Sequence, residues 1–220
     1  MNLYQEKQIS YYTSVRKDLI KLVPAGRSLK VLEIGAGGGD TLVALKESGI
    51  AKEVVGIELF DLPSSQQTHP LIDKMIIADI EKDDIDIANN YFDVVICGDV
   101  LEHLYNPWKI VNKLSDYLVE GGILIASVPN FGHLSVFYNL FVKKNFAYRE
   151  KGTFDRTHLR FFCKKNIGSL VGTSCLEVTA VYANINLTPC KAGLFNRITF
   201  GLVESLITPQ YIGISMKKSK

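Results

Sequence analysis

Short apolar runs alternate with segments of helical spacing along the first 130 residues of the chain. The apolar runs occupy residues 31–34, 53–58, 75–80, 91–98 and 123–130. Apolar residues three or four apart predict helices in residues 5–23, 41–48 and 109–118. Each apolar run is nearly continuous, as expected for strands that helices cover on both faces. This alternation predicts an α/β fold with a doubly wound, mostly parallel sheet that binds its ligand at the carboxyl ends of the strands.

The alternation breaks after residue 130. Residues 131–162 begin with an apolar stretch, for which we expect a helix over 133–146, and continue with a polar stretch of no clear period. We interpret 131–162 as a cap or substrate insertion. Later patterns predict helices at 164–172 and 194–207 and strands at 176–182 and 211–216. The 220 residues are expected to form a single domain, 1–220, with 1–27 as an N-terminal helical segment.

Composition limits the classes of function. Lys and Arg number 25 against 23 Asp and Glu, so the net charge of +2 favours neither nucleic acid nor an anionic membrane as a general partner. Four cysteines without a C-x-x-C pair are typical of a reduced, intracellular chain. The first residues lack the order of a signal peptide, and no apolar run reaches the ~18 residues of a membrane span. We therefore expect a cytoplasmic protein with no transmembrane segment.

A glycine cluster joins the first strand to the helix at 41–48. Gly35, Gly37 and Gly39 permit a sharp turn and close approach of a ligand to the backbone, and the helix directs free N–H groups to the same place. The turn could also bind nothing. Asp40 stands where the dinucleotide fingerprint requires a small residue, which disfavours a pyrophosphate. With Glu33, the segment reads E-x-G-x-G-x-G and resembles the first motif of class I methyltransferases that use S-adenosylmethionine.

This resemblance implies a cofactor site and a seven-stranded sheet with an antiparallel last strand. Glu33 and the glycines would line the aminopropyl-carboxylate and ribose side of S-adenosylmethionine, with S-adenosylhomocysteine as the product. Asp79 and Ile80 would hold the adenine, and the Y-Y-x-x-x-R pattern of Tyr11, Tyr12 and Arg16 would close over the carboxylate, although such aromatics are often core. A carboxylate at the end of the second strand, here Glu58, commonly holds a ribose diol. The predicted cofactor-binding residues are Tyr12, Arg16, Glu33, Gly35, Ala36, Gly37, Gly39, Glu58, Leu59, Asp79, Ile80, Gly98 and Asp99.

Asp99, Glu102 and His103 follow the fourth strand with a spacing that places them on one face of a helical turn. His103 is the candidate general base, because histidine titrates near cellular pH. Asp99 and Glu102 could instead form a capping box with no chemical role. Related ubiquinone-type O-methyltransferases carry a similar E-x-x-E-H element and include metal-dependent enzymes. The three residues could therefore be a base or a magnesium site of oxygen ligands. Since the first acid here is Asp, we assign all three residues to catalysis and none to a metal, and leave magnesium as the alternative.

The string Asp155 to Phe162, D-x-T-H-x-R-F-F, resembles bacterial methyltransferases associated with sugar and surface-polysaccharide assembly. The predicted substrate-binding residues are Arg149, Arg156, His158 and Arg160. An internal salt-bridge cluster is the alternative. The resemblance implies methyl transfer, expected at oxygen, to a small-molecule or glycan acceptor, with lipid-linked acceptors included. A nicotinamide-dependent oxidoreductase and a non-catalytic cofactor-binding subunit remain alternatives. No basic stripe indicates a nucleic-acid substrate, and the oligomeric state is left open.

Overall fold

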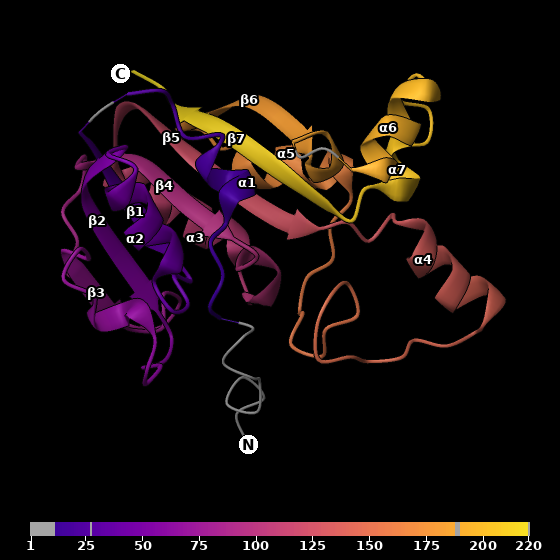
Figure 1. The fold of residues 1–220 in the computed structure, drawn as a ribbon, viewed down its shortest axis with the longest axis horizontal. Coiled ribbons are helices and arrows are strands. Elements are labelled where there is room, and N and C mark those ends of the chain that lie inside the picture. The colour runs from indigo at the N-terminus through magenta and orange to yellow at the C-terminus, as the bar shows by residue number, and fades with distance from the viewer. Residues whose placement is uncertain (1–11, 27, 188–189, 220) are drawn as a thin grey trace.

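The computed structural model describes residues 12–26, 28–187 and 190–219. Seven strands form one sheet in the order β3-β2-β1-β4-β5-β7-β6 (Figure 1). The strands are β1 (Leu29–Ile34), β2 (Ala51–Glu58), β3 (Lys74–Ile77), β4 (Phe92–Gly98), β5 (Leu118–Pro129), β6 (Leu176–Ala183) and β7 (Gln210–Lys217). The first five pair in parallel, and β7 is antiparallel to both β5 and β6. The predicted mostly parallel, seven-stranded sheet with an antiparallel last strand is confirmed.

Helices cover both faces of this sheet, as the apolar strands predicted. On one face, α1 (Lys17–Ile20) and α2 (Asp40–Glu47) bury Leu19, Leu42 and Leu45 against β1, β2 and β4. On the other face, α3 (Pro107–Tyr117) and α5 (Lys164–Val171) bury the apolar side of each helix against the same strands and β5. α3 starts where predicted, with Pro107 in its first turn and Asn106 accepting a 3.1 Å hydrogen bond from Lys109 N–H. Packing on both faces holds the carboxyl ends of β1 and β4 side by side.

The N-terminal helix predicted for residues 5–23 is much shorter in its described part. Only Lys17–Ile20 are helical, residues 12–16 are not, and residues 1–11 lie outside the described part of the chain. The backbone of residues 12–16 is used for tertiary contacts instead. Tyr12 C=O accepts from Gly38 N–H at 2.9 Å, and Arg16 N–H donates to Thr41 Oγ1 at 3.2 Å. We call residues 12–16 the strap, since it lies across the glycine turn.

The boundary between α3 and β5 also differs from the prediction. β5 begins at Leu118, directly after the helix, so Gly121 and Gly122 lie inside the strand rather than before it. Gly121 has φ of 75°, and the register of β5 against β4 shifts between Phe92 and Val94. The two glycines therefore form an irregularity within the strand. The predicted strand, 123–130, therefore starts five residues later than the observed one.

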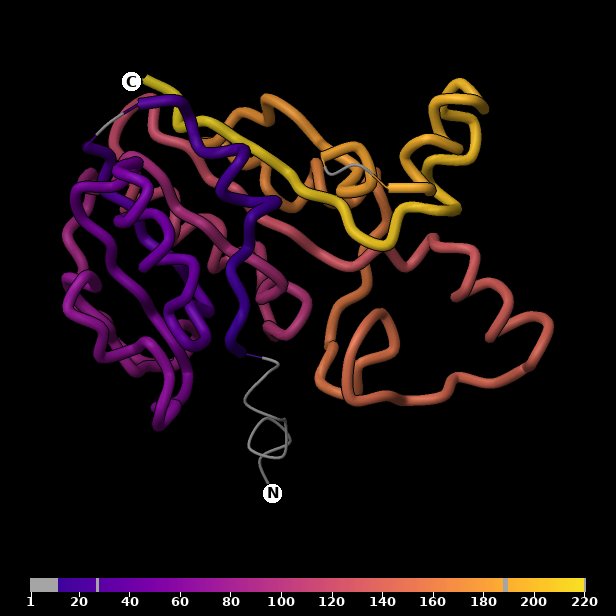
Figure 2. The backbone as a smooth tube through the Cα atoms, viewed as in Figure 1, coloured from indigo at the N-terminus to yellow at the C-terminus, as the bar shows by residue number. Residues whose placement is uncertain are grey.

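Two segments extend from the carboxyl end of β5 and the start of β7. Residues 131–163 leave the sheet as a helical turn, α4 (Leu134–Phe137) and a π-helical turn (Tyr138–Val142), and return as an irregular loop (Figure 2). The predicted 194–207 helix is two helices, α6 (Lys191–Ile198) and α7 (Glu204–Ile207), separated where Phe200 and Gly201 have positive φ. The second crossover contains only a 3-10 turn at Gln66–Thr68. None of the helices in the described residues has the length and apolar character to cross a bilayer.

Candidate active site

The glycine turn forms one wall of a cavity of about 870 Å³ at the carboxyl ends of β1, β2 and β4. Gly35 and Gly37 adopt φ of 67° and 54°, a region that side chains other than glycine rarely occupy. Neither position has space for a Cβ atom: at Gly35 it would collide with Val100, and at Gly37 it would lie 2.5 Å from Tyr12 C=O. The absence of side chains thus lets the turn fit between the strap and the loop after β4.

Two buried carboxylates flank this turn. Glu58, at the end of β2, accepts 2.7 Å and 2.8 Å hydrogen bonds from Gly37 and Leu59 N–H. Glu33, at the end of β1, is 4% exposed, and its Oε2 has no hydrogen-bond partner among the described residues. Burial raises the pKa of Glu33 to about 8, although Arg16 and Thr41 lower it. Burial likewise raises the pKa of Glu58, against its backbone hydrogen bonds. A buried carboxylate oxygen without a partner, as at Glu33 Oε2, fits a cationic or hydroxyl-bearing ligand.

Arg16 joins the strap to the ends of three strands. Its guanidinium contacts Asp99 after β4 at 2.8 Å, Ser127 Oγ on β5 at 3.2 Å and Gln210 Oε1 on β7 at 3.3 Å, and it also pairs with Asp18 on α1 at 2.9 Å. Burial alone would lower the pKa of Arg16, but these carboxylates raise it above its usual value. Asp99 also accepts from Ser127 and from the side-chain amide of Gln210 on β7. The Asp99 carboxylate is therefore held in place from three directions, by the strap, β5 and β7.

This arrangement corrects the capping-box alternative. Leu101–His103 form a 3-10 turn that no side chain caps, and Asp99 precedes it with φ of 57°. Because its carboxylate is committed to Arg16 and Gln210, Asp99 does not join Glu102 and His103 in the predicted cluster. The magnesium set considered from the sequence is not assembled.

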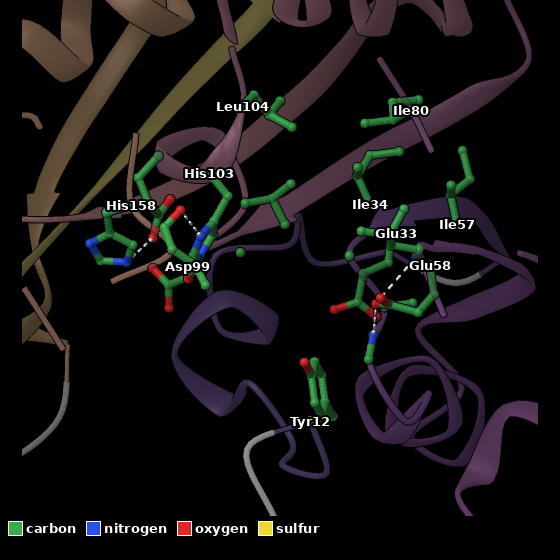
Figure 3. Close-up of a pocket in the computed structure, with 18 of the residues that line it drawn as sticks. Tyr12, Glu33, Ile34, Ile57, Glu58, Ile80, Asp99, His103, Leu104 and His158 are labelled. Atoms are coloured by element: carbon green, nitrogen blue, oxygen red, sulfur yellow. Dashed lines mark hydrogen bonds and ion pairs between the residues drawn. The ribbon is translucent and has the colours of Figure 1, made fainter. Parts of the chain in front are cut away.

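A different cluster forms where the cap meets the loop after β4. Glu102 is 1% exposed, and its Oε1 lies 3.8 Å from His158 Nε2 (Figure 3). The rings of His103 and His158 are 4.7 Å apart, and His103 Nδ1 lies 3.1 Å from Thr157 C=O. A carbonyl only accepts, so Nδ1 carries the proton and Nε2 holds the lone pair. Burial, followed by the charge of Asp99, raises the pKa of Glu102 well above its usual range.

Glu102, His103 and His158 offer ligand atoms within 4.8 Å of one another. Two imidazoles and one carboxylate suit zinc better than magnesium, which prefers oxygen ligands. They are the only group with metal-ligand geometry found in the described ranges 12–26, 28–187 and 190–219.

Backbone contacts attach the cap to this loop. Leu159 and Arg160 N–H both donate to Glu102 C=O, at 2.8 and 2.9 Å. The Arg160 guanidinium donates to Tyr105 C=O, so it holds the cap rather than lining the cavity. Arg149 is exposed and also lies off the lining, whereas Arg156 lines the cavity and contacts Glu150 at 3.1 Å. Of the four predicted substrate-binding residues, Arg156 and His158 therefore line the cavity, and Arg149 and Arg160 do not.

Most predicted site residues converge on one cavity. Its lining includes every predicted cofactor-binding residue except Gly39, which begins α2 and packs against Ile72. Tyr12, Glu33 and Glu58 lie at one end, and Asp99, His103 and His158 at the other (Figure 3). Sequence reasoning missed Gln210, and also Gln67, whose amide donates to Gly37 C=O at 2.8 Å. No local pattern marks either glutamine, because both act on residues far away in the chain.

A family model described as a methyltransferase domain matches residues 4–180. The chain belongs to the methyltransferase domain family. A ubiquinone biosynthesis O-methyltransferase of Idiomarina loihiensis is 30% identical over 200 residues, which are 86% of this chain and 74% of that protein. The protein of the same name from Glaesserella parasuis is 30% identical over 109 residues, 46% of this chain and 45% of its own length. The chain therefore spans slightly less than half of the first curated relatives that it matches.

Solved structures agree on the fold of this methyltransferase. An S-adenosylmethionine-dependent methyltransferase of Mesorhizobium loti aligns with a TM-score of 0.62 and 15% identity, over 91% of this chain and 95% of that one. The family resemblance inferred from the glycine motif is confirmed, and S-adenosylmethionine is the cofactor that it indicates. The site fits such a cationic ligand, since Glu33 and Glu58 present buried carboxylates beside a turn that has no room for side chains.

Proposed function

We propose that this chain transfers a methyl group from S-adenosylmethionine to an oxygen of a small-molecule or glycan acceptor. The observation that carries the proposal is the single cavity that contains a cationic-ligand site at one end and a two-histidine cluster at the other. The cofactor supplies an electrophilic methyl group on a sulfonium. In-line displacement then requires mainly that the protein orient the nucleophile and exclude water.

The cofactor end has a separate task for each polar side chain. Glu33 would pair with the ligand's ammonium group, because its Oε2 is buried and unpartnered in the described structure. Glu58 would accept from the ribose hydroxyls through the lone pair that the backbone N–H groups of Gly37, Leu59 and Phe60 leave open. Asp79 and Ile80 line the cavity beyond Glu58 and would bind the adenine. Tyr12 and Arg16 would cover the aminopropyl-carboxylate from the strap.

At the other end, His103 is the proposed general base. The Thr157 carbonyl fixes its tautomer and leaves Nε2 to take a proton from an acceptor hydroxyl. His158 lies beside it and would orient the acceptor, with Glu102 behind it. A base aligned in this way supports an oxygen acceptor over a nucleophile that needs no deprotonation. The proposal uses no metal, so activity should survive a chelator.

The acceptor class follows from the cap. Arg156 lines the cavity and carries a planar fork suited to a carboxylate or phosphate. We propose an amphiphilic or anionic acceptor, such as a phosphorylated or lipid-linked sugar or a phenol. The curated relatives are named ubiquinone biosynthesis O-methyltransferases, which supports including ubiquinone precursors in the acceptor screen.

The test has two stages. Calorimetry with S-adenosylhomocysteine, S-adenosylmethionine and NAD should give binding of the first two only; binding of NAD alone would replace the proposal with an oxidoreductase. Methyl transfer from labelled S-adenosylmethionine is then screened against phenols, sugar nucleotides and lipid-linked sugars, with and without chelator. His103→Asn protein is the control, because its amide can still donate to Thr157 C=O but supplies no base. Transfer that is equally fast with His103→Asn would contradict the assignment of the base.

A further inference from the structure

Two segments of the fold carry many large apolar side chains that are exposed to water. We define arm one as residues 131–148 and arm two as residues 190–207. About half of the large apolar side chains exposed in the described part of the chain belong to them. The exposed set is Leu134, Phe137, Tyr138, Phe141, Val142 and Tyr148 in arm one, and Leu194, Phe195, Ile198, Phe200, Leu202 and Leu206 in arm two. Such a concentration of exposed apolar side chains indicates an interaction site.

The orientation of α6 shows this exposure of apolar side chains most clearly. Its buried residues are Gly193 and Asn196, whereas Leu194, Phe195 and Ile198 are exposed. A helix that packs on a core in water shows the opposite arrangement. Phe200 and Leu202, in the turn that follows, are 92% and 85% exposed. Arm two thus presents its apolar face outward.

Both arms start from one point. The side-chain amide of Asn130, at the end of β5, donates to the C=O groups of Ser205 and Thr208, each at 2.8 Å. Asn130 N–H donates to Pro209 C=O at 2.9 Å. Both arms accordingly project from the same end of the sheet (Figure 1). Pro129 and Pro209, the neighbours of this junction, line the cavity.

The charges of the arms indicate what covers them. Arm one contains no Asp or Glu, and the single acid of arm two, Glu204, is 2.6 Å from Lys164. Exposed basic residues are Lys143 and Lys144 in arm one and Lys191 and Arg197 in arm two. Acidic residues are nearly as frequent as basic ones in the whole chain, so this bias is local.

We propose that the two arms form a docking surface for an anionic lipid bilayer. Exposed aromatic and aliphatic side chains would enter the interfacial region, and the four cations would meet anionic headgroups. A second copy of this chain fits less well, because a twofold interface through this surface would bring the same basic groups together. The inference rests on the arms alone and does not require the acceptor proposed above.

Vesicle flotation tests the docking surface. The full chain is mixed with phosphatidylcholine vesicles, and with vesicles in which about a third of the lipid is phosphatidylglycerol. We expect at least tenfold stronger partitioning onto the anionic vesicles and loss of binding at high salt. Phe200→Ser with Leu202→Ser, and separately Lys143→Gln with Lys144→Gln, should each reduce partitioning about tenfold or more.

Matched controls distinguish vesicle binding through the arms from nonspecific hydrophobic binding. Leu71→Ser with Ile77→Ser removes exposed apolar side chains beside β3, at the far edge of the sheet, and should leave partitioning unchanged. All variants should retain S-adenosylhomocysteine affinity, which shows that they fold and keeps this test distinct from that of the proposed function. No flotation, or equal flotation on both vesicles, would overturn the proposal. So would a dimer in sedimentation that the Phe200 and Leu202 changes dissociate without any vesicle binding.

Discussion

The raised pKa of Glu33 predicts that cofactor binding depends on pH. The free protein buries this carboxyl without a partner for Oε2, and burial raises its pKa to about 8. A ligand ammonium favours the ionised carboxylate, so binding must expel the proton that the free protein holds. Affinity for S-adenosylhomocysteine should therefore rise with pH. Glu33→Gln, which has the same shape and no charge, should remove this dependence.

The magnitude follows from the fraction of Glu33 that is ionised. With a pKa of about 8, that fraction is about one in ten at pH 7 and about one in a hundred at pH 6. The apparent Kd varies inversely with the competent fraction. It should fall about tenfold, or about 1.4 kcal/mol, from pH 6 to pH 7, and should level off above pH 8.

The stability of the free protein should change in the opposite direction. The pKa of Glu33 is raised from 4.5 to about 8, so the folded state binds the proton more tightly than the unfolded state between these values. The free energy of unfolding contributed by this group therefore decreases as pH rises through that window. Compared with Glu33→Gln, the wild-type protein should lose melting temperature progressively from pH 5 to pH 8.

Titration calorimetry over pH 6 to 8 measures the Kd for S-adenosylhomocysteine. Thermal melting from pH 5 to pH 8 measures the stability of the free protein. Titrations in two buffers of different ionisation enthalpy should reveal close to one proton released per ligand at pH 6 to 7 in the wild-type protein and fewer in Glu33→Gln. The difference between the two proteins isolates Glu33 from other groups that titrate. A wild-type Kd that is flat over this range, or a Glu33→Gln protein with the same slope, would refute the reasoning.

Three further perturbations test other parts of the site. Gly37→Ala should abolish S-adenosylhomocysteine binding, because its Cβ would lie 2.5 Å from Tyr12 C=O and displace the strap; melting should show a fold that persists, and normal affinity would contradict this. His103→Asn should lower kcat about 10²–10⁴-fold at unchanged S-adenosylhomocysteine affinity, and a near-normal kcat would return the histidine to a packing role. Arg156→Ala should raise the KM of the acceptor without changing melting, whereas Arg160→Ala should lower the melting temperature by loosening the cap; the reverse pattern would exchange the two roles.

The sheet could be predicted from the sequence because its strands are short apolar runs with clear punctuation. The runs in β1, β2 and β4 are buried on both faces, so their nearly continuous apolar sequences are enough to predict them as strands. The strap could not be predicted in this way. Its apolar spacing is helical, but hydrogen bonds to Gly38 and Thr41, distant in the chain, override that local preference.

The same distinction applies to the site. Residues that a glycine motif or a strand end brings to the cavity, such as Glu33 and Glu58, were found from spacing. Asp99 was placed in the cavity correctly but given the wrong neighbours, since its partners Arg16 and Gln210 are 83 and 111 residues away. Two of the four predicted substrate residues lie off the lining because a string of polar residues does not reveal which of them face inward.

The position of β7 has a consequence for folding kinetics. β6 contacts the rest of the sheet through β7 alone among the strands, yet β6 precedes β7 in the chain. β6 can therefore join the parallel part of the sheet only through β7, and the pairing of β7 with β5 is non-local and slow. Gln210, at the start of β7, also completes the cluster around Asp99. In refolding, recovery of ligand binding should consequently lag behind recovery of the helical circular dichroism signal, because the candidate site is completed by the strand that docks late.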